Sequence, residues 1–247
     1  MSPLSDGAKA VLLDVEGTTT PLAFVTKVLF PYVREHLRAH LEQHAATSDD
    51  YASILDRLGR EHHASLQRGE TPPAWVDGPT HARIASAVGF VEWLMDRDVK
   101  STPLKELQGR IWEDGYRQGA LVGQVFPDVP PALRRWNDQS LNLGVFSSGS
   151  VLAQRLLFQH SSAGDLTRLL HAFFDTNIGA KIDPDSYRRI AQCLGRPVNT
   201  IVFLSDAPRE LDAAREAGMP VRLVIRPGNA PFAADHDYVA IHGFDGL

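Results

Sequence analysis

Cysteine is almost missing from this sequence of 247 residues, in which Cys193 is the single example. One cysteine cannot form an intrachain disulfide, so a reducing compartment suits the chain and we expect the protein in the cytoplasm. Free cysteines are among the residues most often buried in folded proteins. We therefore expect Cys193 to be a buried residue of a helix.

An excess of basic residues is also lacking, because Lys and Arg together number 25, Asp and Glu number 30, and the formal net charge is -5. This balance argues against a general attraction to DNA, RNA or an anionic membrane. The N-terminal segment MSPLSDGAKAVLLDVEG has one lysine and an apolar run too short for a secretory signal or a membrane span. We expect a small metabolite as the partner, no nucleic acid, no membrane, and a monomeric chain.

Two sequence motifs with well-defined chemistry are absent, GxxxxGK[ST] and HExxH. Without the first, the chain lacks the main residues of an ATP-binding P-loop, and kinase chemistry is not expected. What the chain does have is an ordinary globular composition, with 43% hydrophobic and 22% charged residues. Such a chain can bury a sizeable core.

Short apolar runs alternate with helical patterns over much of the sequence. Runs at residues 10–15, 143–147, 172–174 and 200–204, with a fifth at 221–225, are typical of buried parallel strands. Helical spacing occurs at 152–158, 187–194 and 210–217, and Gly195 and Gly218 stand where helix C-caps belong. This alternation predicts an α/β fold built on a doubly wound parallel sheet.

The interval between the first two predicted strands is too long for a single crossover helix. Amphipathic patterns at 51–68, 81–97 and 103–118 predict helices there, and an apolar face from Val25 to Leu41 predicts another, which Pro31 should kink or break. We therefore predict an inserted helical cap domain at residues 22–122, with the catalytic core formed by residues 1–21 and 123–247.

Acidic residues follow two of the predicted strands. Asp14 and Glu16 stand at the end of the first strand, and Asp206 directly follows the strand IVFLS. In open α/β sheets, ligands collect outside the carboxyl ends of the strands. Three carboxylates gathered there could hold a hard cation such as Mg²⁺, and a nucleophile and an acid/base could be divided between Asp14 and Glu16. Solvent-exposed acidic residues are also common at strand ends, so these residues alone are weak evidence. Glu210 and Asp212 fall in the first turn of a predicted helix, where the helix dipole by itself favours acidic residues.

Two further polar elements suit a phosphate group. Ser147 and Ser148 follow the second strand and precede a predicted helix, where hydroxyls and free backbone N–H groups can bind an anion. An ordinary serine N-cap is the alternative. Lys181 follows the third strand, and its charge can neutralise both a carboxylate and a phosphate oxygen. An exposed loop lysine is the alternative there.

The order of these elements resembles the haloacid dehalogenase superfamily of phosphohydrolases, with all four of its motifs matched. The resemblance extends from about residue 10 to about residue 231 and is more specific than the superfamily. The segments that resemble the acireductone synthase family, the enolase-phosphatases of methionine salvage, are DVEGTTTPLAFV, FSSGSVLAQRLLF, FDTNIGAKIDPDSY, FLSDAPRELDAAREAGM and RPGNAP.

The resemblance implies a role for each motif residue. Asp14 is implied as nucleophile and metal ligand, Glu16 as acid/base and metal-associated residue, and Asp206 as metal ligand. Lys181 is implied to hold phosphate and nucleophile together, and Ser147 and Ser148 to bind the phosphate of the substrate. The implied cofactor is one Mg²⁺ per chain. The implied reaction converts 2,3-diketo-5-methylthiopentyl-1-phosphate to the acireductone 1,2-dihydroxy-3-keto-5-methylthiopentene and phosphate.

Other functions stay open at this point. One is a plain phosphomonoesterase of the same superfamily acting on another small phosphorylated metabolite, against which Glu16 argues because generic relatives have Asp there. A second is a phosphate-metabolite binding module that has lost turnover.

A separate feature of the sequence is a row of histidines, His36, His40 and His44, at a spacing of four. These could share a helix face and bind a transition metal, but their polar surroundings favour a solvated helix face.

Overall fold

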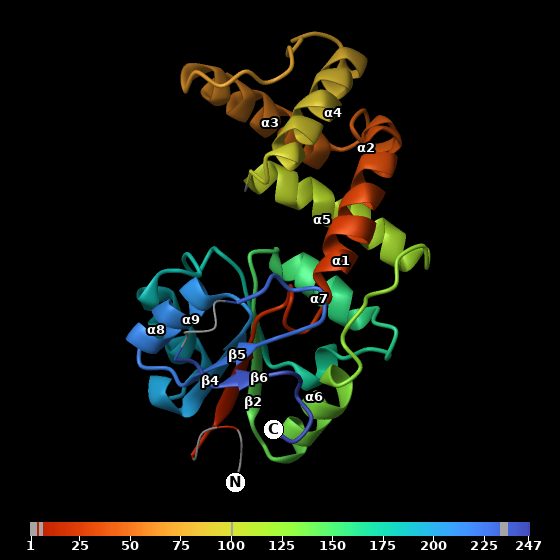
Figure 1. The fold of residues 1–247 in the computed structure, drawn as a ribbon. Coiled ribbons are helices and arrows are strands. Elements are labelled where there is room, and N and C mark those ends of the chain that lie inside the picture. The colour runs from red at the N-terminus through yellow and green to blue at the C-terminus, as the bar shows by residue number, and fades with distance from the viewer. Residues whose placement is uncertain (1–3, 5–6, 100, 233–236) are drawn as a thin grey trace. The chain divides into compact units, whose positions relative to one another are not determined.

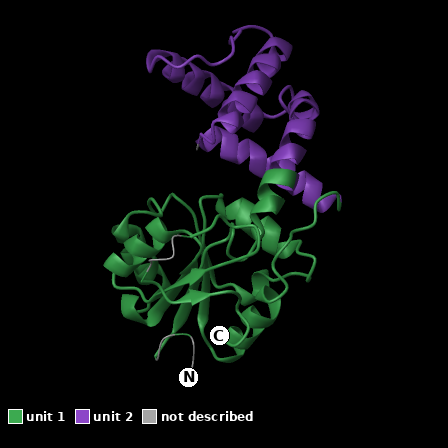
Figure 2. Ribbon diagram, viewed as in Figure 1, with its two compact units in different colours: residues 1–27, 119–247 green, residues 28–118 purple. Residues whose placement is uncertain are grey.

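The computed structural model describes residues 4, 7–99, 101–232 and 237–247. The chain divides into two compact units (Figure 2). Residues 1–27 and 119–247 form the first, and residues 28–118 form the second. The helical segment is therefore an insertion between two parts of an α/β core. The predicted insertion, residues 22–122, includes the whole of this second unit. Its action as a cap stays a prediction.

The core unit contains a parallel sheet, as predicted. Its strands within the described residues follow the order β3-β2-β1-β4-β5-β6. β1 (Ala10–Leu13) lies between β2 (Asn142–Phe146) and β4 (Ile201–Ser205), and Leu12 is level with Gly144 on one side and Phe203 on the other. β3 (Ala172–Phe174) and β5 (Val221–Val224) flank them. The edge strand β6 (Ala240–Ile241), which pairs with β5, was not predicted.

Helices lie on both faces of this sheet (Figure 1). α8 (Pro184–Leu194) and α9 (Pro208–Glu216) pack on one face, where Tyr187 and Leu211 join Phe146 and Phe203 in a fully buried cluster. α6 (Val129–Asp138) and α7 (Val151–Gln159) lie on the other. Short 3₁₀ turns occur at η2 (Thr167–Leu169) and η3 (Val198–Thr200). The doubly wound α/β prediction is confirmed.

A broken helix leads into the second unit. α1 (Leu22–Phe24) continues through a π-helical segment, η1 (Val25–Leu29), into α2 (Phe30–His44). Pro31 lies in the first turn of α2. A proline has no N–H to donate and its ring crowds the carbonyl four residues earlier. The predicted break at Pro31 therefore takes the form of a widened turn placed before the proline.

The second unit is built from amphipathic helices. α3 (Asp49–Gln67), α4 (Thr80–Asp96) and α5 (Thr102–Arg117) follow α2. α2 packs on α4 and α5, and Val33, Leu37 and Leu41 of α2 are completely buried. Burial of such stripes provides most of the stability of short helices, which are marginal alone.

Two expectations about exposure are wrong. Cys193 lies on α8 but is exposed, because the buried face of that helix is formed by Tyr187, Ile190 and Ala191. His40 is only 7% exposed, so the histidine row is not a solvated helix face. Its surroundings come from α3 and α5, which a pattern within α2 cannot reveal.

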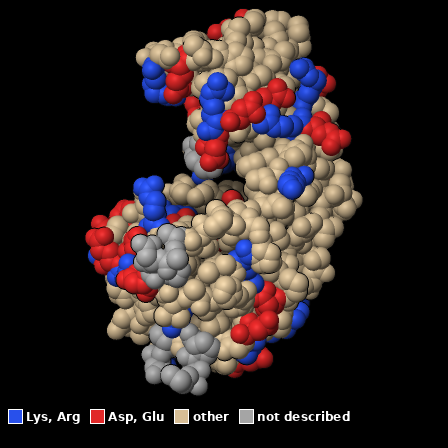
Figure 3. Space-filling view, viewed as in Figure 1, with Lys and Arg blue, Asp and Glu red and all other residues tan. Residues whose placement is uncertain are grey.

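Charge on the molecular surface is mixed in sign. On the face drawn in Figure 3, Lys and Arg side chains alternate with Asp and Glu rather than gathering by sign. The ion pairs of the protein include Arg34 with Asp96 and Arg57 with Glu106. Among the residues that the structure describes, none of the helices is both long and apolar enough to cross a bilayer.

Candidate active site

The carboxyl ends of β1 and β4 bring three acidic side chains to one edge of the sheet. Asp14 directly follows β1, Asp206 directly follows β4, and Glu210 lies in the first turn of α9. Asp14 is only 4% exposed, and Asp206 and Glu210 are half-buried. Parallel pairing of the two strands fixes this arrangement, since the backbone N–H of Asp14 also donates to the carbonyl of Leu204 at 3.0 Å.

Lys181 lies between two of these carboxylates. Its Nζ is 2.5 Å from Asp14 Oδ1 and 2.6 Å from Glu210 Oε2. The lysine is 8% exposed, and the Tyr187 hydroxyl donates to its carbonyl oxygen at 2.7 Å. Asp183 then caps the following helix, α8, by accepting from the N–H of Asp185. The lysine is therefore a buried member of the site and not an exposed loop residue.

The charges in this cluster shift one another's pKa values. Burial acts to lower the pKa of Lys181, but the Asp14 and Glu210 carboxylates outweigh it and the pKa is raised. Burial raises the pKa of Asp206 to about 7, with repulsion from Asp14 and Glu210 adding to the effect. Burial also raises the pKa of Glu210 to about 7, and repulsion from Asp14 acts in the same direction. One ammonium group does not balance three carboxylates.

Thr18 and Asn229 connect the two strand ends. The Thr18 hydroxyl donates to Asp14 Oδ2 at 3.1 Å and accepts from the N–H of Asp206 at 3.0 Å. Asn229 Nδ2 donates to Asp206 Oδ2 at 3.0 Å and to the carbonyl of Gly17 at 2.9 Å. Asn229 Oδ1 is buried without a hydrogen-bond partner among the described residues. These contacts hold the Asp14 loop against the Asp206 loop.

Gly17 makes this close approach possible. Its φ is +75°, a conformation that residues with a side chain rarely adopt. A Cβ at this position would overlap the Asp206 carboxylate and lie 3.2 Å from Asn229 Oδ1. The turn after β1 therefore requires glycine for two separate reasons. Glu16, one residue earlier, is exposed, whereas Asp14 is buried.

The serines after β2 have different local roles. Ser147 is 4% exposed, and its hydroxyl accepts from the N–H of Gly149 at 3.0 Å. The N-cap of α7 is Ser150, whose hydroxyl accepts from the N–H of Ala153 at 3.2 Å. The ordinary N-cap explanation thus applies to Ser150. Ser147 and the half-buried Ser148 lie in the loop before the cap, at the carboxyl end of β2, next to β1.

The structure thus brings together Asp14, Lys181 and Asp206 from the predicted set. It adds Glu210. From the sequence alone, an acidic residue at this position is explained equally well by the dipole of the helix that begins there. Thr18 and Asn229 were not singled out individually, although both belong to the quoted segments DVEGTTTPLAFV and RPGNAP. Asp212 lies elsewhere, because it pairs with Arg215 and accepts from the Tyr238 hydroxyl.

A cluster of buried oxygen ligands with excess negative charge is suited to a hard divalent cation. The three carboxylates and the unpartnered Asn229 Oδ1 supply only oxygen atoms. A cation would also relieve the repulsion that raises the pKa of Asp206 and Glu210. The residues present therefore fit Mg²⁺ better than a metal that prefers nitrogen or sulfur.

Comparison with known proteins gives consistent results. Residues 8–218 match the family model of haloacid dehalogenase-like hydrolases. The chain is 46% identical to enolase-phosphatase E1 of Synechococcus elongatus, covering 99% of this chain and 100% of that protein. It is also 46% identical to enolase-phosphatase E1 of Drosophila mojavensis, covering 93% and 90%. The crystal structure of the UTR4 protein of Saccharomyces cerevisiae superposes with a TM-score of 0.78 at 31% identity, covering 97% of this chain and 100% of that one.

These matches extend over both the sheet and the inserted helices. They agree with the family that the order of the motifs indicates. The chain belongs to the haloacid dehalogenase-like hydrolases and, within them, to the enolase-phosphatase E1 family.

Proposed function

We propose that the chain is a Mg²⁺-dependent enolase-phosphatase that converts 2,3-diketo-5-methylthiopentyl-1-phosphate to the acireductone 1,2-dihydroxy-3-keto-5-methylthiopentene and phosphate in methionine salvage. The observation that carries the proposal is the buried Asp14–Lys181 pair at 2.5 Å, in a chain 46% identical to an enolase-phosphatase E1 over 99% of its length. The substrate follows from the relatives, and the chemistry follows from the site.

Asp14 is the nucleophile of the phosphatase half of this reaction. Its carboxylate attacks phosphorus, the bond from phosphorus to the substrate oxygen breaks, and an aspartyl-phosphate forms. Lys181 neutralises charge on the nucleophile before attack and on the phosphoryl oxygens during it. Thr18 holds Asp14 Oδ2 by its 3.1 Å hydrogen bond, which fixes the direction of the carboxylate.

Glu16 is the acid/base in this proposal. It is exposed, two residues beyond the buried Asp14, so it can exchange protons with water and substrate. As acid it protonates the departing oxygen. As base it takes a proton from the water that attacks the aspartyl-phosphate, which frees phosphate and restores Asp14.

Ser147 and Ser148 bind the phosphate through hydroxyl and backbone N–H groups in the loop before α7. Of the buried carboxylates, Asp14 and Asp206 would hold Mg²⁺ together with Glu16, whereas Glu210 pairs with Lys181. Asn229 would keep Asp206 in position by its 3.0 Å hydrogen bond. When bound, the ion supplies positive charge that polarises the ketone and phosphate oxygens and acidifies the adjacent C–H. The enolisation half then needs a base near that carbon, and Glu16 is the candidate that we name within the core.

The inserted helical unit would act as a cap in this reaction. Both the enolate and the aspartyl-phosphate require that water be admitted selectively, and a movable helical domain is one means of doing so.

The proposal also includes that the chain is a monomer and that it acts in the cytoplasm. Light scattering on the purified chain tests the monomer.

The decisive experiment follows both products. The chain is incubated with the diketo phosphate and Mg²⁺, while ultraviolet absorbance records the enol and a colour assay records phosphate. The proposal expects the enol to appear first and phosphate to follow. Phosphate release without enol or acireductone would leave a plain phosphomonoesterase. The Asp14→Asn variant should lose phosphate release, and unchanged release would remove Asp14 as the nucleophile.

A further inference from the structure

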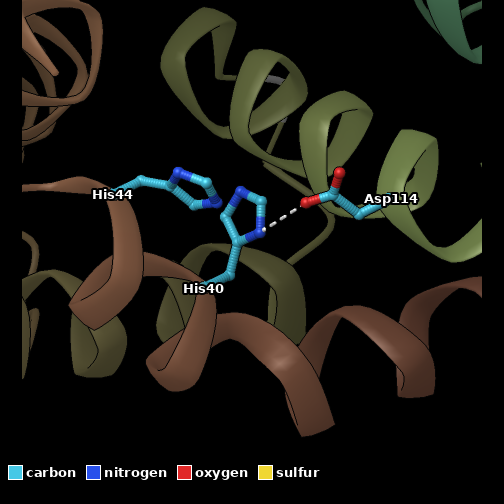
Figure 4. A group of neighbouring side chains, drawn as sticks. All are labelled: His40, His44 and Asp114. Atoms are coloured by element: carbon cyan, nitrogen blue, oxygen red, sulfur yellow. Dashed lines mark ion pairs between the residues drawn. The ribbon is translucent and has the colours of Figure 1, made fainter.

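A second group of side chains of the types that bind metal ions lies in the helical unit, within residues 28–118. His40 and His44 are one turn apart on α2, and Asp114 comes from α5. Each offers one ligand atom, and these atoms all lie within 4.8 Å of one another. Figure 4 shows the His44 ring and the Asp114 carboxylate on either side of the His40 ring.

Ordinary hydrogen bonding explains only part of this group. His40 Nδ1 is 3.2 Å from Asp114 Oδ2, and His40 Nε2 is 2.6 Å from the Tyr51 hydroxyl of α3. His44 Nε2 is different, because it is buried and has no hydrogen-bond partner in the described part of the chain. A buried polar atom without a partner destabilises the folded chain, and such atoms call for an explanation.

We propose that His40, His44 and Asp114 form a binding site for a divalent transition-metal ion such as Zn²⁺, which joins α2 to α5. Two imidazole nitrogens and one carboxylate oxygen are a ligand set that Zn²⁺ accepts, with water as the fourth ligand. Mg²⁺ and Ca²⁺ prefer oxygen ligands, so this site differs in preference from the carboxylate cluster of the core.

The distances are compatible with this ligand set. Zinc–nitrogen bonds of about 2.0–2.1 Å in a tetrahedron place neighbouring ligand atoms about 3.3 Å apart. The 3.2 Å between His40 Nδ1 and Asp114 Oδ2 already matches that separation. His44 shares a helix face with His40, with ring centroids 4.7 Å apart, and its ligand atom lies within 4.8 Å of the other two.

Protonation and outer contacts also suit a metal. A neutral imidazole ring has a lone pair on one nitrogen to donate to a metal ion. When Nδ1 donates that lone pair to an ion, the ring proton lies on Nε2 and the Tyr51 oxygen accepts it. Metal-binding histidines commonly have such a partner on their second nitrogen. Arg117 pairs with the other oxygen of Asp114 and leaves Oδ2 directed at His40.

Titration of the full chain with Zn²⁺ tests the proposal. The protein is first stripped with a chelator and then saturated with Mg²⁺, so that the core carboxylates are occupied. Calorimetry should show one Zn²⁺ per chain, and Co²⁺ should give the visible absorption of a four-coordinate site. Zn²⁺ should also raise the melting temperature by a few degrees, because a ligand that binds only the folded chain stabilises it.

Variants locate the ion. His44→Gln should lower the Zn²⁺ affinity at least about tenfold and remove the shift in melting temperature. His36→Gln is the matched control, because His36 lies one turn before His40 on α2 but outside the cluster. Asp114→Asn should behave as His44→Gln does. The proposal is overturned if wild-type protein binds no Zn²⁺ in the presence of Mg²⁺, or if His44→Gln binds it as tightly as wild type.

Discussion

Lys181 Nζ lies 2.6 Å from Glu210 Oε2, and this contact gives Glu210 a position in the site that its place in the first turn of α9 does not reveal. Ser205 also donates to the same oxygen at 3.1 Å. Glu210 therefore orients the ammonium group that neutralises Asp14. A positioning residue of this kind acts through the lysine and need not touch the substrate.

We expect the Glu210→Gln variant to release phosphate roughly 10–100-fold more slowly, because one of two carboxylates that fix Lys181 becomes neutral. KM should change less than kcat, since the proposed phosphate ligands, Ser147 and Ser148, are untouched. Steady-state kinetics of phosphate release measures both. Asp212→Asn, two residues after Glu210 on α9 but paired with Arg215 outside the site, is the control and should keep wild-type rates. Equal rates for Glu210→Gln and wild type would contradict a positioning role.

Removal of the lysine itself should have a larger effect on stability. Lys181→Met leaves the Asp14 and Glu210 carboxylates together without their cation, and breaking a buried ion pair from one side costs about 3–5 kcal/mol. Urea unfolding measures this loss. Mg²⁺ should restore part of it by supplying positive charge.

The matching control is Lys27→Met, because Lys27 is an exposed lysine of η1. Its free energy of unfolding should stay within about 0.5 kcal/mol of wild type. If both variants lose the same amount, the buried cluster has no special electrostatic dependence on Lys181.

Comparison of Gly17 with Gly119 separates two costs of replacing a glycine, the backbone strain at positive φ and the steric overlap of the new side chain. Gly17→Ala places a side chain at φ +75° and also against the Asp206 carboxylate. Gly119→Ala meets nearly the same backbone strain at φ +73° with nothing within 4 Å. A residue in the left-handed region costs roughly 1–2 kcal/mol.

The Gly119→Ala variant should therefore lose roughly that amount, and Gly17→Ala should lose clearly more. Because Asp206 must move, Gly17→Ala should also bind Mg²⁺ more weakly, whereas Gly119→Ala should not. Urea unfolding with and without Mg²⁺ records both effects. Equal losses in the two variants would show that the approach of Gly17 to Asp206 is not tight.

Much of this arrangement is readable from the sequence, and the reasons are local. The strands β1, β2 and β4 consist mainly of apolar residues because both faces of a parallel sheet are covered. The end of each run then places Asp14, Ser147 and Asp206 at one edge of the sheet. β6 escaped prediction because two residues, Ala240 and Ile241, carry too little pattern.

Other features depend on contacts between distant residues. His40 was expected to be solvated, yet Tyr51 and Asp114 cover it from two other helices. Cys193 was expected to be buried, yet it lies on the outer side of α8. Asn229 reaches Gly17 across more than two hundred residues of sequence, and its amide carries no signal of that partner. Burial and partners of polar side chains therefore require the tertiary structure.

The carboxylate cluster should make the metal-free protein sensitive to pH. Asp206 and Glu210 have folded-state pKa values raised to about 7, from ordinary values of 3.8 and 4.5. Between these limits the folded chain binds more protons than the unfolded chain, so their contribution to stability is present below about pH 4 and is lost as the pH rises through about 7. His40 acts in the opposite direction, because its lowered pKa of about 4 disfavours the folded state in acid.

Comparison of wild type with Asp206→Asn isolates the first effect, since asparagine keeps the shape of the side chain and has no charge to lose. With a chelator present, the free energy of unfolding of wild type should fall relative to that of Asp206→Asn as the pH rises from about 4 to about 7. Saturating Mg²⁺ should abolish the difference in slope, because the cation stabilises the ionised carboxylate of the wild type. Urea unfolding at several pH values measures both series. Parallel curves in the chelator would mean that Asp206 is ionised normally in the folded chain, and the charge imbalance inferred for this cluster would then be wrong.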